Sequence, residues 1–186
     1  MKKFELTTEF ITNMFGKKLF RIKALVEFGN VKAGELGGYV EKEENVSQDG
    51  NAWVSGDARV YGDAEVSGNA RVSGNARVYG NAWVSGNAEV YGDAWVSGNA
   101  WVYGNARVSS DADYALVQGF GTEFRCTTFY RGKNKKIMVN CGCFHGDLEG
   151  FRKQVKETRN GKIAKEYLMI ADLMEYHFTS EDSSNE

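Results

Sequence analysis

The sequence predicts a mainly β protein: a parallel β-helix of about three to four coils, with an N-terminal cap and a small C-terminal α+β domain. Three observations predict it. Residues 51–110 read [ND]-A-x-V-[SY]-G ten times over, with one lapse at Ser110. The stretch before them is punctuated by glycine, and the composition changes at Asp113. We divide the chain into 1–50, the cap and a degenerate first coil; 51–112, the hexapeptide-repeat β-helix; 113–178, a domain of three strands and two helices; and 179–186, a mobile tail.

Each hexapeptide predicts one short strand and one corner. Ala and Val stand two positions apart and therefore point to the same side of the strand, while the x residue and the Ser or Tyr point to the other side. Gly followed by Asn or Asp supplies the positive φ and the side-chain-to-backbone bonds of a tight corner. Because one short strand cannot bury its Val alone, the repeats must stack around an interior of Ala and Val.

This repeat resembles the hexapeptide-repeat, left-handed parallel β-helix family, in which three hexapeptides complete a triangular coil. The resemblance implies the handedness and a coil of 18 residues, so that side chains 18 apart lie above one another at about 4.8 Å. Three faces result. The first carries alternating charges, the second stacks two tyrosines and lays an arginine over an indole, and the third is the most apolar. Their columns are Trp53, Arg71, Glu89 and Arg107; Arg59, Arg77 and Trp95 beside Tyr61, Tyr79 and Ser97; and Glu65, Trp83 and Trp101 beside Ser67, Ser85 and Tyr103.

The third face should be covered, because soluble monomers seldom leave such an apolar patch bare. Trp83, Trp101 and Tyr103 form it. The C-terminal domain and two further copies of the chain are the two alternatives for the cover. Since relatives in the β-helix family commonly assemble as trimers, we expect a homotrimer.

The segments that flank the repeats predict ordinary elements. In KLFRIKALVEF, residues Phe20, Ile22 and Ala24 share one strand face, and an irregular repeat over Val40, Val46 and Val54 indicates a degenerate coil that caps the solenoid. Downstream we expect strands at 113–118, 123–130 and 136–144. We expect helices near 147–158, beginning at an Asp147 cap and burying Leu148, Phe151 and Val155, and near 162–178, with an apolar stripe of Ile163, Tyr167, Ile170 and Met174.

Hexapeptide-repeat proteins include acyltransferases with a histidine base and carbonic-anhydrase relatives with three zinc-binding histidines. The repeats of this chain contain no histidine, because His145 and His177 both follow them. The loop that often interrupts the repeats of such enzymes is also missing. We therefore expect no catalytic residue and no cofactor, and keep an acyltransferase as an alternative.

Cys126 and the run Cys141, Cys143 and His145 are weak candidates for a zinc site. If the hairpin turns about Lys133 and Asn134, Cys126 lies directly opposite Cys141. The spacing differs from the usual paired C-x2-C pattern, and free cysteines are commonly small buried apolar residues, so we predict no metal.

The charge balance excludes a long nucleic acid. Four arginines face eight acidic residues over 46–113, a balance of −4. We keep as an alternative ligand a small nucleotide held by Arg59, Arg77 and Trp95. The chain also lacks an apolar stretch long enough to span a membrane and a signal peptide, so we expect the cytoplasm.

The C-terminal segments TTFYRGKNKKIMVNCGCF, GDLEGFRKQVKETRNG and KEYLMIADL resemble a small domain of phage and prophage proteins, and VKAGELGGYVEKEENVSQDGNAWV resembles the opening of phage-borne hexapeptide-repeat proteins. Arg159 stands where that domain is expected to carry histidine. Residues 120–178 have a balance of +4. We take as candidate binding residues Lys133, Lys135, Lys136, Phe144 and Arg159.

This resemblance suggests a mobile-element origin and brings no activity with it. Our hypothesis of function is a non-catalytic phage-type accessory protein, a trimeric scaffold that presents its C-terminal domain to a host or phage protein. The alternative from another class is an inhibitor of host antiviral defence that binds an immune protein or sequesters a signalling nucleotide. In either case the protein would work in the host cell cytoplasm.

Overall fold

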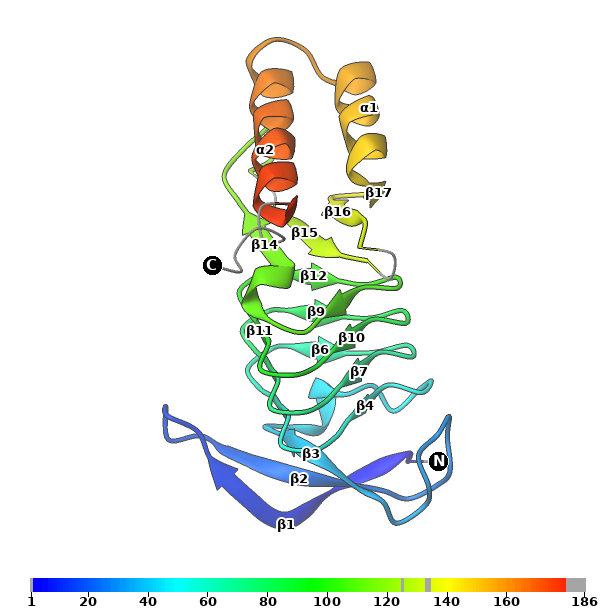
Figure 1. Ribbon diagram of the computed structural model, residues 1–186. Coiled ribbons are helices and arrows are strands. Elements are labelled where there is room, and N and C mark those ends of the chain that lie inside the picture. Colours follow the sequence, from blue (N-terminus) through cyan, green and yellow to red (C-terminus); the bar gives the residue numbers. More distant parts are fainter. Residues whose placement is uncertain (1, 125, 133–134, 180–186) are drawn as a thin grey trace, which may run out of the picture. The chain divides into compact units, whose positions relative to one another are not determined.

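The computed structural model describes residues 2–124, 126–132 and 135–179, and the chain divides into two compact units, 1–111 and 112–186. In the first unit the hexapeptides form a β-solenoid of two-residue strands (Figure 1). These strands make three parallel stacks, in the orders β4-β7-β10-β13, β5-β8-β11 and β6-β9-β12. The strands are β4 (Trp53–Val54), β5 (Arg59–Val60), β6 (Glu65–Val66), β7 (Arg71–Val72), β8 (Arg77–Val78), β9 (Trp83–Val84), β10 (Glu89–Val90), β11 (Trp95–Val96), β12 (Trp101–Val102) and β13 (Arg107–Val108).

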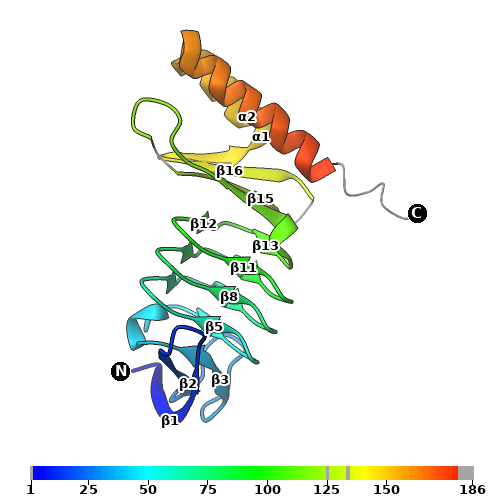
Figure 2. The same ribbon diagram turned by 90° about the vertical axis from the view of Figure 1, so that its left-hand side faces the viewer.

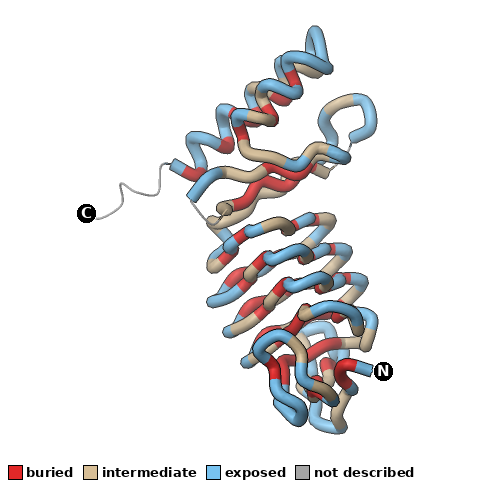
Figure 3. Tube along the Cα trace, turned by 90° about the vertical axis from the view of Figure 1, so that its right-hand side faces the viewer, coloured by how far each residue is buried: buried red, intermediate tan, exposed pale blue. Residues whose placement is uncertain are grey.

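The register confirms the predicted length of the coil, three hexapeptides. Val54 pairs with Val72 and Val66 with Val84, and the same offset recurs in every stack of repeats. Every Ala and Val at the two inward positions of the repeat is at most 1% exposed. Figure 3 shows this alternation of buried and exposed positions along each coil. Small and β-branched side chains therefore fill the interior, as the pattern predicts.

Main-chain hydrogen bonds join each coil to the next. Within one hexapeptide the amides of Asn69, Arg71 and Ser73 donate to the carbonyls of Gly86, Ala88 and Val90, at 2.8, 2.9 and 2.9 Å. Each of these carbonyls belongs to the following coil. The amides that join the coils consequently point toward the C-terminal end of the stack, and the carbonyls that accept from them point toward its N-terminal end.

The corners need glycine for two reasons. Gly86 has φ +68, in the left-handed region, and a Cβ built on it would lie 2.8 Å from the Gly104 amide nitrogen of the next coil. We predicted that the neighbouring Asn and Asp would bond to the backbone. The corner side chains instead bond to one another. Asn69 Nδ2 donates to Asn87 Oδ1 at 3.1 Å, Asn51, Asn81 and Asn87 donate to an asparagine in the same way, and Asn75 donates to the Asp93 carboxylate. Stacking at the strand spacing brings the corner side chains of successive coils within reach, which forms ladders.

The N-terminal segment caps the solenoid, as predicted. Strands β1 (Phe4–Thr12) and β2 (Lys18–Ala24) are antiparallel, and β3 (Leu36–Val40) pairs with β2 and, in parallel, with β5. The first coil is irregular: Val40 pairs with Val60, and Val46, after the short helix η1 (Glu43–Asn45), bridges to Val66. Both offsets are longer than the offset from Val54 to Val72 in the regular repeats, which confirms a degenerate coil over Val40 and Val46.

Two side chains of the cap satisfy carbonyls at the N-terminal end of the stack. The Asn45 amide is fully buried and donates to the Gly62 and Ala64 carbonyls at 3.1 and 2.8 Å. Lys3, 4% exposed, donates from Nζ to three more carbonyls, those of Asp49, Gly50 and Ala52. The end of the ladder is therefore paired without a further coil, as buried carbonyls require.

Trp53 differs from its predicted place on an exposed charged face, since it is only 2% exposed. The rings of Phe4 and Phe28 meet its indole edge to face, with centroids 6.2 and 5.4 Å away. The cap folds over this position and buries it. Periodicity alone gives the outward direction of a side chain but cannot say that another segment covers it.

The second unit is an antiparallel sheet with two helices. Strands β14 (Tyr114–Val117), β15 (Thr127–Arg131), β16 (Ile137–Cys141) and β17 (Phe144–Asp147) lie in chain order, and α1 (Leu148–Thr158) and α2 (Gly161–Thr179) follow on one side of them (Figure 2). Their core contains the predicted residues Leu148, Phe151, Val155, Tyr167, Ile170 and Met174, with Ile163 only partly buried.

The prediction of three strands in this domain was wrong. The segment expected as one strand over 136–144 is two strands, because Gly142, at φ +60, turns the chain between β16 and β17. The predicted tail lies outside the described residues from position 180 onward.

We predict that replacing Asn45 with Ala destabilises the solenoid by about 2–3 kcal/mol, because buried carbonyls lose their donor. The four tryptophans all lie in the solenoid, so urea unfolding followed by their fluorescence measures the effect. Asn69→Ala, on an exposed ladder, is the control and should cost less than about 1 kcal/mol. Equal losses of stability in Asn45→Ala and Asn69→Ala would contradict the capping role of Asn45.

Gly86→Ala should be more destabilising than Gly98→Ala. Both glycines have nearly the same left-handed φ, +68 and +67, so both substitutions carry the conformational cost of about 1–2 kcal/mol. Only at Gly86 does the new methyl also meet the next coil, since no described atom lies within 4 Å of a Cβ at Gly98. Urea midpoints of the two variants measure the difference, and identical midpoints would rule out the contact between coils as a second constraint.

Candidate functional site

The third face of the solenoid presents two tryptophans side by side. The rings of Trp83 and Trp101 are perpendicular, with centroids 5.4 Å apart, and the side chains are 38% and 43% exposed. Trp83 Nε1 donates to Ser67 Oγ at 3.0 Å. Tyr103, close to Trp101 in the chain, is half-buried, and its burial raises the pKa of its hydroxyl. The two contacting indoles form an apolar patch on this face, at the positions that the columns predicted.

The second face has the predicted stacks, and the stacked groups lie in contact with one another. Tyr61 and Tyr79 lie parallel with centroids 5.0 Å apart, and the Arg77 guanidinium lies 4.4 Å from the centre of the Trp95 ring. Tyr61 is buried against Leu19 and Tyr39 of the cap, and this burial raises its pKa. The face therefore offers no open slot between two described aromatic rings for a base.

The first face carries a shallow hollow that the sequence did not indicate as a site. Arg107 and Glu89 form an ion pair at 3.1 Å, and the charge alternation there was predicted. The hollow has a volume of about 360 Å³ and is lined by Arg71, Ser73, Glu89, Tyr91 and Arg107. Glu89 offsets one of the two arginine charges in the hollow, which weakens the attraction of the hollow for an anion.

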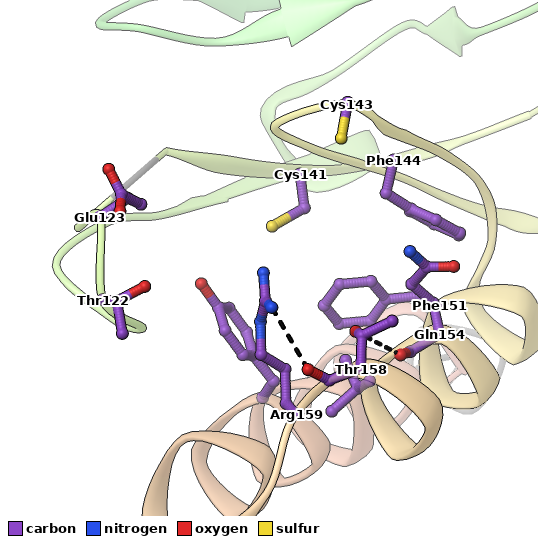
Figure 4. Close-up of a pocket in the computed structure, with 11 residues that line it drawn as sticks. Thr122, Glu123, Cys141, Cys143, Phe144, Phe151, Gln154, Thr158 and Arg159 are labelled. Carbon is purple, nitrogen blue, oxygen red and sulfur yellow. Dashed lines mark hydrogen bonds between the residues drawn. The ribbon is translucent and has the colours of Figure 1, made fainter.

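The C-terminal unit contains a cavity of about 320 Å³ (Figure 4). Its walls come from the end of β16, the turn into β17 and its first residue, the loop before β15, the helix α1 with the residue that follows it, and Tyr167 of α2. Phe144 and Arg159, two of the predicted binding residues, meet here with Cys141 and Cys143. The full lining is Thr122, Glu123, Cys141, Cys143, Phe144, Phe151, Gln154, Val155, Thr158, Arg159 and Tyr167.

The cysteines do not assemble as a zinc site would require. Thr127, not Cys126, pairs with Cys141, and its hydroxyl donates to the Cys141 sulfur at 3.2 Å. The register differs by one residue because Arg131 pairs with Ile137, which leaves an odd number of residues in the turn. Cys143 is exposed.

The remaining candidate ligands also have other surroundings. Burial raises the pKa of the Cys126 thiol and lowers that of His145, whose Nδ1 lies 2.7 Å from Asn140 Oδ1. Among the described residues no three His, Cys, Asp or Glu side chains gather as a metal site.

The described members of the predicted lysine group, Lys135 and Lys136, do not line this cavity. Lys133 is outside the described residues, and Lys135 is exposed at φ +58. Lys136 Nζ lies 3.3 Å from Asp147 Oδ2, at the start of α1. Since Met138 pairs with Asp147 whereas Cys141 pairs with Phe144, Lys136 and the cavity are at opposite ends of the β16–β17 pair. The predicted binding residues that the structure describes in this domain therefore form two groups.

Comparison with known proteins supports the fold class only. A family model described as the YdcK beta solenoid repeat matches residues 64–80 and 70–86. A search of curated proteins finds no match. The fold and this match define a β-solenoid repeat protein. No helix in the described part of the chain is long and apolar enough to cross a membrane.

Asp147 should stabilise the C-terminal unit in a pH-dependent way. Its carboxylate caps α1 by accepting from the Gly150 amide at 2.9 Å, and this bond, with Lys136, lowers the pKa of Asp147. We expect Asp147→Ala to cost about 1 kcal/mol at neutral pH. Because the folded pKa is depressed, the stabilisation is complete above the unfolded pKa of about 4 and is lost as the pH falls through the folded pKa.

Circular dichroism at the helical wavelength measures this, since both described α-helices belong to this unit. Lys136→Gln is the control. It removes only the exposed ion pair and should cost about 0.5 kcal/mol or less. If Asp147→Ala destabilises the unit equally at neutral and at acid pH, the result would contradict a role of the charged carboxylate as the cap.

Proposed function

We propose that this chain is a non-catalytic accessory protein of the phage or prophage type. In this proposal a left-handed β-helix serves as a rigid homotrimeric spacer, and the C-terminal unit binds another macromolecule in the host cytoplasm. The observation that carries the proposal is the pair of exposed, contacting indoles of Trp83 and Trp101 on the third face.

The energetics favour covering this pair. Burying the exposed part of each indole would contribute about 2 kcal/mol. The cap buries Trp53 and Tyr61 on the other two faces. Trp95 of the second face is 39% exposed but has the Arg77 guanidinium over its ring, whereas Trp83 and Trp101 expose two adjoining indoles. Two further copies of the chain would bury the same patch three times about one axis.

The solenoid suits the role of a spacer. Each coil bonds to its neighbours through backbone ladders and side-chain ladders such as Asn51, Asn69 and Asn87. Such an array is stiff along its axis because every contact is repeated at each step. Its repeats contain no histidine that could act as a base.

The double variant Trp83→Ser/Trp101→Ser should convert trimer into monomer, or weaken it by at least about tenfold, because six indoles leave the interface. Multi-angle light scattering of the full chain measures the mass. Trp95→Ser is the matched control, since Trp95 is 39% exposed but lies on the second face. A stable monomer of the unsubstituted chain would contradict the proposed trimer.

The second candidate function is interference with host defence by sequestering a signalling nucleotide. The observation in its favour is the guanidinium of Arg77 over the indole of Trp95, with Arg59 in the adjacent coil. These groups could contact a phosphate and a base if the stack opened. A purified sample that releases no nucleotide on denaturation, and binds none of a nucleotide panel, would remove this candidate.

A further inference from the structure

The cavity of the C-terminal unit has an apolar floor made of three aromatic rings. The Phe144 and Phe151 rings are tilted with centroids 5.6 Å apart, and the Phe151 and Tyr167 rings are perpendicular at 5.9 Å. Tyr167 is held in place because its hydroxyl donates to the Phe120 carbonyl at 3.3 Å. Phe151 and Tyr167 are buried in the core, so the floor is rigid. A cavity of about 320 Å³ over such a floor accommodates one large apolar group.

Arg159 places a positive charge above this floor. It ends α1 with an extended backbone, φ −126 and ψ 156, and its amide donates to the Val155 carbonyl. Figure 4 shows its guanidinium extending from the end of the helix toward Cys141. The side chain reaches into the cavity because the chain leaves the helix at this residue.

Most N–H donors of the Arg159 guanidinium have no partner among the described residues. Within the described residues its side chain makes one hydrogen bond, to the Thr158 carbonyl at 3.3 Å, and no ion pair. Arg152, on the same helix, shows the contrasting case of a guanidinium bound by three carboxylates, those of Glu149, Asp172 and Glu175. An arginine has five N–H donors in a fork that matches a carboxylate.

The other polar groups narrow the choice of anion. The Gln154 side chain also lines the cavity and adds an amide donor. The Thr158 hydroxyl, in contrast, already donates to the main-chain carbonyl of Gln154 at 2.7 Å. Glu123 lies on the loop at the other side of the cavity (Figure 4) and forms no ion pair with Arg159 in the described structure. Its negative charge repels a dianion such as a phosphate monoester about twice as strongly as a single carboxylate at the same distance, which favours the carboxylate.

We propose that this cavity binds a monocarboxylate attached to an apolar group, with Arg159 holding the carboxylate and the Phe144, Phe151 and Tyr167 rings holding the apolar part. Two sources provide this chemistry: the C-terminal residue of a polypeptide and a free small acid. The inference deepens the proposed function and rests on its statement that the C-terminal unit is the binding part.

The test uses the full chain and two matched pairs of probes. The first pair is 3-phenylpropanoate and its neutral amide. The second is the peptide acetyl-Gly-Ser-Leu-Phe with a free C-terminal carboxylate and with a C-terminal amide. Titration calorimetry, supported by saturation-transfer NMR for weak binding, gives each Kd. At least one acid should bind about tenfold or more tightly than its own amide, because a charge-assisted pair is lost in the amide.

The variants assign the effect to Arg159. Arg159→Gln should weaken the acid about tenfold or more and leave the amide unchanged, and Arg159→Lys should restore part of the affinity. Lys153→Gln is the matched control, since it removes one positive charge from an exposed position of α1 that does not line the cavity. Its Kd should equal that of the unmodified chain. Melting curves check that each variant is folded.

The outcomes distinguish the two sources of the ligand, and they distinguish a failure of this inference from a failure of the proposed function. Binding of the peptide acid alone assigns the site to a chain terminus, and binding of the small acid alone assigns it to a free acid. Acids and amides that bind equally, no binding of either acid, or equal losses in Arg159→Gln and Lys153→Gln would overturn the inference. Light scattering of the same sample separates the failures: a monomer that binds the acid refutes only the trimeric spacer, and a trimer that binds neither acid refutes only the cavity's ligand.

Discussion

The hydrogen bonds between successive coils are the constraint on which the rest of the first unit depends. The strand amides donate to carbonyls of the following coil, as from Arg71 to Ala88, and this fixes which side chains lie above one another. The inward Ala and Val columns, the corner glycines and the Asn ladders all follow from that register. A residue such as Gly86 is constrained twice, by its own left-handed φ and by the backbone of the next coil.

A ladder of this kind has two unlike ends, and the N-terminal end explains the cap. There the carbonyls have no preceding coil. Strand β3, the Asn45 amide and the Lys3 ammonium take its place. Burial lowers the pKa of Lys3 to about 8, which reflects how far this charge is withdrawn from water. The same cap buries Trp53 and Tyr61, whereas Trp83 and Trp101 stay exposed together on the third face.

The proposed functions belong to separate units and use different physics. Self-association would rely on the burial of apolar surface, which the paired indoles of the third face offer. Recognition in the C-terminal unit would rely on one guanidinium that its own chain leaves with few partners, above a rigid aromatic floor. Arg152 lies within α1 and Arg159 at its end, yet the first is neutralised by carboxylates of both helices and the second is not.

The sequence by itself determined the solenoid, the inward and outward positions of each repeat and the helices of the second unit, because the spacing of apolar residues is a local property. The coil of three hexapeptides, and with it the three outward columns, came from the resemblance to the β-helix family, and the register confirmed it. The stacking of Arg77 on Trp95 and the contact of Trp83 with Trp101 followed from that period. Only the tertiary structure decided that Trp53 is covered, that Thr127 rather than Cys126 faces Cys141, and that Phe144 and Arg159 share a cavity while Lys136 pairs with Asp147. These outcomes depend on contacts between distant segments and on the number of residues in single turns, and no repeat pattern encodes either.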